Sequence, residues 1–102
     1  MAQFDVFRNP HGKRFPLLLD VQSELLSRLA TRVVVPMARR KRSAAAQIGR
    51  LNPTASVEGV EYVAVFQEMA AVPASALGER VGSLARQRDE LIAAVDLLFT
   101  GV

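Results

Sequence analysis

The sequence predicts a small, mostly antiparallel β domain that is closed by one C-terminal helix. Up to about residue 73, short alternating or β-branched runs are separated by proline, glycine and asparagine turns. From about residue 84 the apolar spacing becomes helical and continues to about residue 99. At 102 residues the chain has the common size of one domain, so residues 1–102 are expected to form a single unit.

The first two predicted strands lie on either side of a turn. Phe4 and Val6 alternate with polar neighbours, which is typical of a half-buried strand. Residues 9–12, Asn-Pro-His-Gly, have turn chemistry. The second strand covers residues 15–21, where the leucines at 17 and 19 share one face with Val21.

The middle of the chain is less regular. A β-branched run, Val33 to Val35, favours a short strand that Pro36 ends. The preceding residues 22–31 favour a loop or a helical turn, because adjacent Leu25 and Leu26 cannot both point inward from a strand. Residues 39–53 are compatible with either a helix over 43–48 or a long loop.

Residues 60–67 form the strongest predicted strand. Apolar side chains occur on both of its faces, which places it centrally in a sheet. Residues 69–72 are expected to return beside it through a tight hairpin and to end at Pro73.

The predicted C-terminal helix covers about residues 84–99, with Ser83 as its N-cap. Arg86 and Glu90 are four residues apart, a spacing at which they can form an exposed ion pair. Gly101 is suited to the left-handed backbone conformation that commonly ends a helix. One helical stripe unites several side chains: Leu84, Arg88, Leu91, Val95 and Leu98, with Ile92 and Phe99 alongside.

The last six residues, 97–102, carry large apolar side chains and no polar tail. Because chain ends are usually poorly ordered unless something holds them, this end is a candidate binding surface. A core helix that happens to be last is the simpler alternative.

Composition argues for a binding protein rather than an enzyme. Half of the residues are hydrophobic and 23% are charged, which is typical of a globular protein. There is no cysteine and only one histidine, His11, so we expect no metal site and no cofactor. No hydrolase triad or phosphate-binding loop is recognisable. Without a signal peptide or a long apolar run, a soluble cytoplasmic protein with no membrane contact is expected.

The positive charge is concentrated in one run. The formal net charge is +3, and residues 39–42 read Arg39, Arg40, Lys41 and Arg42. Such a run is suited to phosphate groups or to an acidic partner, although a solvated loop is the simpler and favoured explanation. No aromatic residues interleave with these bases as they would on a nucleic-acid stacking platform.

Several segments, in this order, resemble the CcdB family of toxin–antitoxin toxins, and the similarity is collinear from Gln3 to Val102. The segments are Asp20-Val21-Gln22-Ser23, Val34-Val35-Pro36, Met69-Ala70-Ala71-Val72-Pro73, Leu77-Gly78-Glu79 and Phe99-Thr100-Gly101-Val102.

The resemblance implies an SH3-like antiparallel barrel with a C-terminal helix, assembled as a homodimer. It implies that the toxin binds the A subunit of DNA gyrase and traps the gyrase–cleaved-DNA complex, so that DNA is contacted only indirectly. A cognate CcdA-like antitoxin would neutralise it. The gyrase-binding residues implied by position are Leu25, Leu26, Asp96, Phe99, Thr100, Gly101 and Val102.

This chain departs from the family pattern at several of these positions. Thr100 stands where the family usually has tryptophan, Asp96 where it has asparagine, and Val102 where it has isoleucine. The basic run 39–42 is also more charged than the family pattern, and we hypothesise that it contacts acidic side chains of the antitoxin.

Two alternative functions follow. One is an RNA endonuclease on a related barrel, for which Arg14, Arg28 and Arg32 are loose candidates. The other is a degenerate, non-toxic homologue that still binds antitoxin, an alternative that Thr100 raises directly.

Overall fold

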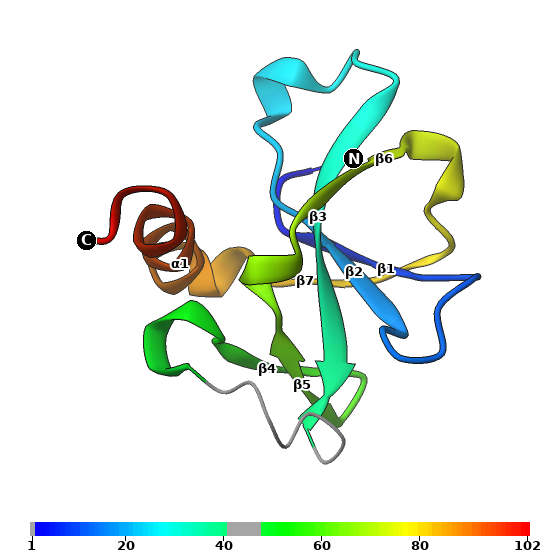
Figure 1. The fold of residues 1–102 in the computed structure, drawn as a ribbon. Coiled ribbons are helices and arrows are strands. Elements are labelled where there is room, and N and C mark those ends of the chain that lie inside the picture. The colour runs from blue at the N-terminus through cyan, green and yellow to red at the C-terminus, as the bar shows by residue number, and fades with distance from the viewer. Residues whose placement is uncertain (1, 41–47) are drawn as a thin grey trace.

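The computed structural model describes residues 2–40 and 48–102, and it confirms the predicted fold class. In this part of the chain seven antiparallel strands form a curled sheet, and one α-helix stands at its side (Figure 1). The strands are β1 (Asp5–Arg8), β2 (Leu17–Asp20), β3 (Thr31–Arg39), β4 (Thr54–Val57), β5 (Val60–Ala64), β6 (Ala70–Pro73) and β7 (Arg80–Ser83). The helix α1 covers Arg88–Thr100.

The first two strands follow the sequence pattern. β1 pairs with β2 and with β7, and β2 pairs with β3. Leu17 and Leu19 enter the main core and Val21 packs against it, while Leu18 and Asp20 lie on the opposite face of β2. The period-two alternation therefore predicted both faces correctly.

β3 is longer than predicted, because Pro36 lies inside it and does not end it. Along one edge β3 pairs with β2, and along the other it pairs first with β6 over residues 31–34 and then with β5 over residues 37–39. Pro36 falls between these two partners, where its carbonyl oxygen accepts a hydrogen bond from the backbone N–H of Val65 (2.9 Å). Its missing N–H therefore costs no ladder hydrogen bond at this junction.

The predicted hairpin between the fifth and sixth strands is wrong. β5 does lie inside the sheet, between β4 and β3, as its two apolar faces indicated. It ends at Ala64, however, and the 3₁₀ helix η4 (Phe66–Glu68) redirects the chain so that β6 pairs with β3. Pro73 is the last residue of β6, as expected.

Two irregular segments contain short 3₁₀ helices. Residues 22–31 include η1 (Glu24–Leu26), which agrees with a helical turn. Residues 48–53 include η3 (Gly49–Leu51), whereas the rest of the helix or loop expected over 43–48 lies outside the described residues.

The helix α1 begins later than predicted. The 3₁₀ helices η5 (Ala74–Ala76) and η6 (Ala85–Gln87) lie on either side of β7, and the Ser83 hydroxyl accepts from the Ala85 N–H (3.2 Å). Ser83 therefore does not cap the α-helix, whose N-cap is Gln87, and it lies one residue before Leu84, the N-cap of η6. The expected pair of Arg86 with Glu90 does not form, because Glu90 accepts instead from the Gln87 side chain (2.9 Å).

α1 packs beside η3 and η4 and contributes to the main core. Leu84, Leu91 and Ala94 are buried, and Ile92 and Val95 pack against them. Arg88, which the helical stripe included, is exposed. None of the helices in the described residues is long and apolar enough to cross a membrane.

Candidate partner-binding site

The end of α1 presents the first exposed apolar surface. Phe99 is 68% exposed and Val102 is 79% exposed, although the same helix buries Ala94 about one turn and Leu91 about two turns before Phe99. Gly101 adopts φ +76° and ψ +13°, and its N–H donates to the carbonyl oxygen of Leu97 (3.1 Å). This left-handed cap ends the helix and turns Val102 away from it, as the sequence predicted.

The polar side chains of this helix end are also exposed. The Thr100 hydroxyl donates to the Asp96 carbonyl oxygen (2.7 Å), so it bonds back to its own helix. Five of the seven residues implied by the family resemblance are therefore brought together within about one helical turn and its cap. They are Asp96, Phe99, Thr100, Gly101 and Val102.

A second apolar surface lies on the loop around η1, and neither of its adjacent leucines points inward. Leu25 is 94% exposed and Leu26 is 50% exposed. Leu29, 52% exposed, lies in the same loop and was not among the residues predicted from the sequence. Three exposed leucines within five residues are unusual in a monomeric protein and indicate a contact surface.

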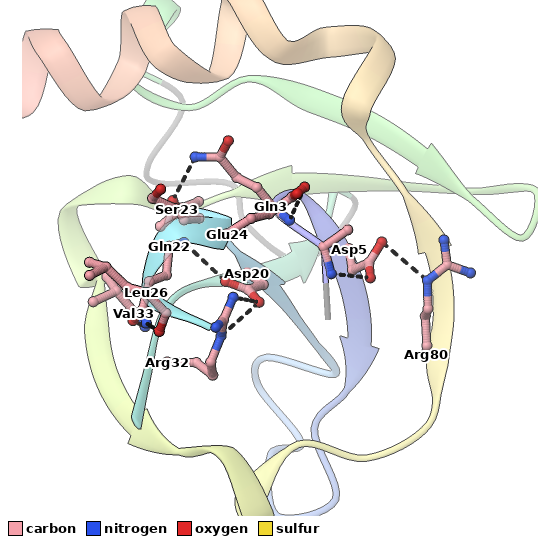
Figure 2. A network of polar contacts seen from close by, with 12 residues as sticks. Gln3, Asp5, Asp20, Gln22, Ser23, Glu24, Leu26, Arg32, Val33 and Arg80 are labelled. Atoms are coloured by element: carbon pink, nitrogen blue, oxygen red, sulfur yellow. Dashed lines mark hydrogen bonds and ion pairs between the residues drawn. The ribbon is translucent and has the colours of Figure 1, made fainter. Parts of the chain in front are cut away.

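A buried polar network supports this loop (Figure 2). Asp20 on β2 and Arg32 on β3 are both fully buried, on the face of the sheet opposite the main core. The Arg32 Nε and Nη2 atoms donate to Asp20 Oδ2 at 3.0 and 2.6 Å, and Asp20 Oδ1 accepts from the Gln22 N–H at 3.0 Å. Both carboxylate oxygens are therefore satisfied inside the protein.

Gln22 connects this ion pair to the exposed loop. Its side-chain Nε2 donates to the Leu26 carbonyl oxygen (3.0 Å), and its Oε1 accepts from the Val33 N–H (3.0 Å). At the other end of η1, the Ser23 hydroxyl accepts from the Leu25 N–H (3.2 Å). The backbone that carries the exposed leucines is thus anchored to two paired strands.

The two apolar surfaces are not adjacent within one chain. In Figure 1 the loop that follows β2 and the C-terminus lie at separate corners of the molecule. The structure therefore divides the seven predicted residues into a helix-end group and a loop group, Leu25 and Leu26.

The basic run is only partly described. Arg39 and Arg40 are exposed at the end of β3, and Lys41 and Arg42 lie outside the described residues. Arg39 lines an open pocket of about 410 Å³ together with the turn between β1 and β2. The sequence alone does not join these two segments, because nothing in the linear order places residues 13 and 39 together.

The arginines considered for ribonuclease chemistry have three different surroundings. Arg14 lines that basic pocket, Arg28 is exposed in the loop after η1, and Arg32 is buried against Asp20. Within residues 2–40 and 48–102 no group of three or more histidine, aspartate or glutamate residues could hold a metal ion. The described residues therefore form two exposed apolar surfaces and one pocket lined by basic residues, which are suited to contact with a partner.

Comparison with known proteins gives this arrangement a context. A family model described as CcdB protein matches residues 3–101. The chain belongs to the CcdB family. Membership places it among the toxins of toxin–antitoxin systems.

One solved structure has a similar fold. An endoribonuclease in complex with its cognate antitoxin, from a mycobacterial species, superposes with a TM-score of 0.75 at 15% sequence identity. The match covers 96% of this chain and 93% of the other. At 15% identity this similarity concerns the fold alone.

Proposed function

We propose that this CcdB-family chain acts as a homodimer that binds the A subunit of DNA gyrase and traps the enzyme on cleaved DNA. The observation that carries the proposal is the capped helix end, where Phe99 and Val102 are exposed in a chain whose family membership is that of a toxin. A toxin of this kind works by occupying a surface of another enzyme, so it needs contacts and no reacting groups of its own.

The exposed loop supplies a second contact of the same chemical type. The loop that carries Leu25 and Leu26 lies away from the helix end (Figure 1), so a target that engages both surfaces of one protomer must be extended. In a two-fold symmetric dimer each surface occurs twice, which suits a target that is itself a dimer.

A gyrase cleavage assay tests the proposal. Purified chain is incubated with gyrase and supercoiled plasmid, and the DNA is examined after detergent and protease treatment. Linear plasmid is the expected product, and its absence at high toxin concentration would contradict gyrase trapping. Total RNA is incubated with the chain in parallel, because RNA fragments would support the endoribonuclease alternative and neither product would support an inert antitoxin binder.

Matched variants connect the outcome to the two surfaces. Phe99→Ser and Leu25→Ser each remove an exposed apolar side chain, and we expect each to lower trapping about tenfold or more. Leu98→Ser on the same helix is not an equivalent control, because Leu98 is partly buried. Val60→Ser is the better control, because Val60 is 38% exposed at the β4–β5 turn and lies in neither group. Equal loss of trapping in all three variants would contradict the proposal that the helix end and the loop are the gyrase-binding surfaces.

A further inference from the structure

The strands β4 and β7 touch each other without pairing. They are the two ends of the strand order β4-β5-β3-β2-β1-β7, and no backbone hydrogen bond joins them in the part of the chain that the structure describes. They are nevertheless in contact, because a Cβ atom at Gly82 of β7 would lie 3.8 Å from Cγ1 of Val57 on β4. Val57 is buried and belongs to the main core, so this β4–β7 seam forms part of the wall of the core.

The tip of the β4–β5 hairpin extends beyond the rest of the sheet. β3 pairs with β5 only over Tyr62 to Ala64, so residues 57–61 have β-sheet pairing only within the hairpin. The turn consists of Glu58 and Gly59, with φ values of +51° and +77°. A left-handed backbone is unfavourable for a residue that has a Cβ atom, and asparagine, aspartate or glycine is the usual choice in such a turn. The tip therefore combines an unfavourable turn residue with little backbone support.

Side chains, and not backbone groups, bridge the seam at both ends of β4. At the hairpin turn, Arg8 Nη2 donates to Glu58 Oε1 (2.8 Å), and Arg8 Nε lies 3.7 Å from Glu79 Oε1. At the start of β4, the Gln87 side-chain Nε2 donates to the Thr54 carbonyl oxygen (3.0 Å). Of these contacts, only the pair of Arg8 with Glu58 holds the tip.

The backbone that carries the Arg8 side chain is fixed on both sides. The Arg8 N–H donates to the Glu79 carbonyl oxygen (2.8 Å), and the Arg8 carbonyl oxygen accepts from the Gly78 N–H (2.9 Å). A Cβ atom at Gly78 would lie 2.8 Å from that carbonyl oxygen, so glycine permits this close approach. Arg8 therefore connects a firmly bonded part of the sheet to a tip that is bonded to one neighbouring strand only.

We propose that residues 57–61 form a flap that opens away from β7, and that Arg8 is the latch that holds it closed. The latch is exposed to solvent, since the side chains of Arg8 and Glu58 are 51% and 54% exposed. Such a pair is weak and is screened by salt, so the flap opens more often as the ionic strength rises. Opening makes the Val57 side chain accessible. The gyrase contact does not enter this closure, because the flap lies outside the helix end and the η1 loop.

Thiol labelling tests the flap, because the chain contains no cysteine of its own. Val57→Cys places one thiol at the seam, and Val35→Cys places one on fully buried β3 as a reference for global unfolding. Each reporter is combined with Arg8→Gln, or with Arg28→Gln as the control that removes the same charge from the exposed loop after η1. Labelling by N-ethylmaleimide, a neutral reagent, is followed by mass spectrometry at several low concentrations of urea.

In the otherwise native chain we expect the thiol at position 57 to react at least about tenfold faster than the thiol at position 35. Its rate should also depend little on urea, because local opening exposes much less surface than global unfolding. Equal rates at the two positions, with the same steep urea dependence, would overturn the flap, since both thiols would then react only through global unfolding.

Arg8→Gln should raise the labelling rate at position 57 about threefold at low ionic strength, whereas Arg28→Gln should leave it within about 1.5-fold. In about 1 M sodium chloride, where the Debye length is about 3 Å, the native chain should label as fast as the Arg8→Gln variant. An unchanged rate in Arg8→Gln, or an equal rise in the Arg28→Gln control, would overturn the role of Arg8.

A double variant identifies the partner of the latch. Glu58→Gln should accelerate labelling about as much as Arg8→Gln, and the two substitutions together should add little to either alone. Effects that multiply in the double variant would contradict the pair of Arg8 with Glu58, because independent contributions would then hold the flap.

Discussion

The η1 loop and the end of α1 expose similar side chains but are supported in different ways. The loop depends on Asp20 and Arg32, which are buried on paired strands, and on Gln22, which connects that pair to the Leu26 carbonyl. The helix end depends on hydrogen bonds between near neighbours and on the left-handed Gly101. The shape of the loop is therefore a property of the folded sheet, whereas the shape of the helix end is mostly local.

This difference affects the consequences of mutation. A buried ion pair contributes little net stability compared with apolar residues, but removing one partner leaves an uncompensated charge. The loss of a helix cap costs less free energy than the loss of one partner of a buried ion pair, and it affects only the end of the helix. Substitutions in the loop support should therefore destabilise the whole domain, and substitutions at the helix end should alter binding with little effect on folding.

The largest expected effect is that of Arg32→Ala. It leaves the buried Asp20 carboxylate without a cation, so the free energy of unfolding should fall by about 3–5 kcal/mol. Urea denaturation followed by circular dichroism measures this change. Arg8→Ala is the control, because Arg8 is 51% exposed and its partner Glu58 is 54% exposed, so the removal of Arg8 should cost less than about 1 kcal/mol. Similar losses of unfolding free energy in both variants would show that the burial of Asp20 and Arg32 does not determine the cost of removing the arginine.

Thr100→Trp tests the helix end by adding contact area. Thr100 is exposed and its side chain bonds only to its own helix, so the folding stability should change by less than about 0.5 kcal/mol. Tryptophan is enriched at interface hot spots, and a gain of about 2 kcal/mol for each copy would strengthen gyrase trapping roughly a thousandfold in a dimer. The amount of toxin needed for half-maximal plasmid cleavage measures this gain. Weaker trapping would show that the terminus docks differently in this chain.

Gln22→Ala is expected to loosen the loop and to destabilise the domain by about 1–3 kcal/mol. It leaves the Val33 N–H and the Leu26 carbonyl without their side-chain partners. Amide hydrogen exchange should become faster over residues 23–30, while α1 keeps its protection. Gln3→Ala is the control, because it removes only one bond, to the Val21 carbonyl oxygen (3.2 Å). Uniform acceleration across loop and helix would count against a specific anchoring role.

Gly101→Ala has the smallest expected effect, because its cost of about 1 kcal/mol is confined to the end of the helix, which can fray without unfolding the domain. A Cβ atom there meets nothing within 4 Å, so the cost comes from the positive φ alone. We expect faster hydrogen exchange of the backbone amide at position 101 and weaker gyrase trapping, while the midpoint of urea denaturation stays almost unchanged. Gly101→Asn should restore part of the trapping, because asparagine tolerates the left-handed conformation. Identical behaviour of the two variants would indicate that the cap geometry is unimportant.

The sequence was most informative where structure depends on near neighbours. The alternation over residues 17–21 predicted which side chains enter the core, and Gly101 predicted the end of the helix. The start of that helix was predicted too early, since the Ser83 hydroxyl accepts from the Ala85 N–H just before η6, and the α-helix begins only after that 3₁₀ helix. Local signals identify an element more reliably than they identify its first residue.

The remaining features depend on contacts between distant segments. Pro36 is tolerated within β3 only because two different strands pair on either side of it, and β6 joins β3 only because η4 redirects the chain. The tertiary structure also buries Asp20 and Arg32 together beneath the leucine loop, and it brings Lys13 and Arg14 beside Arg39. The sequence by itself determined the β-then-helix order and the capped apolar terminus, because side-chain periodicity and backbone preference act over a few residues. Strand partners, buried charge pairs and the basic pocket were decided by the fold, because each requires residues that only sheet pairing brings together.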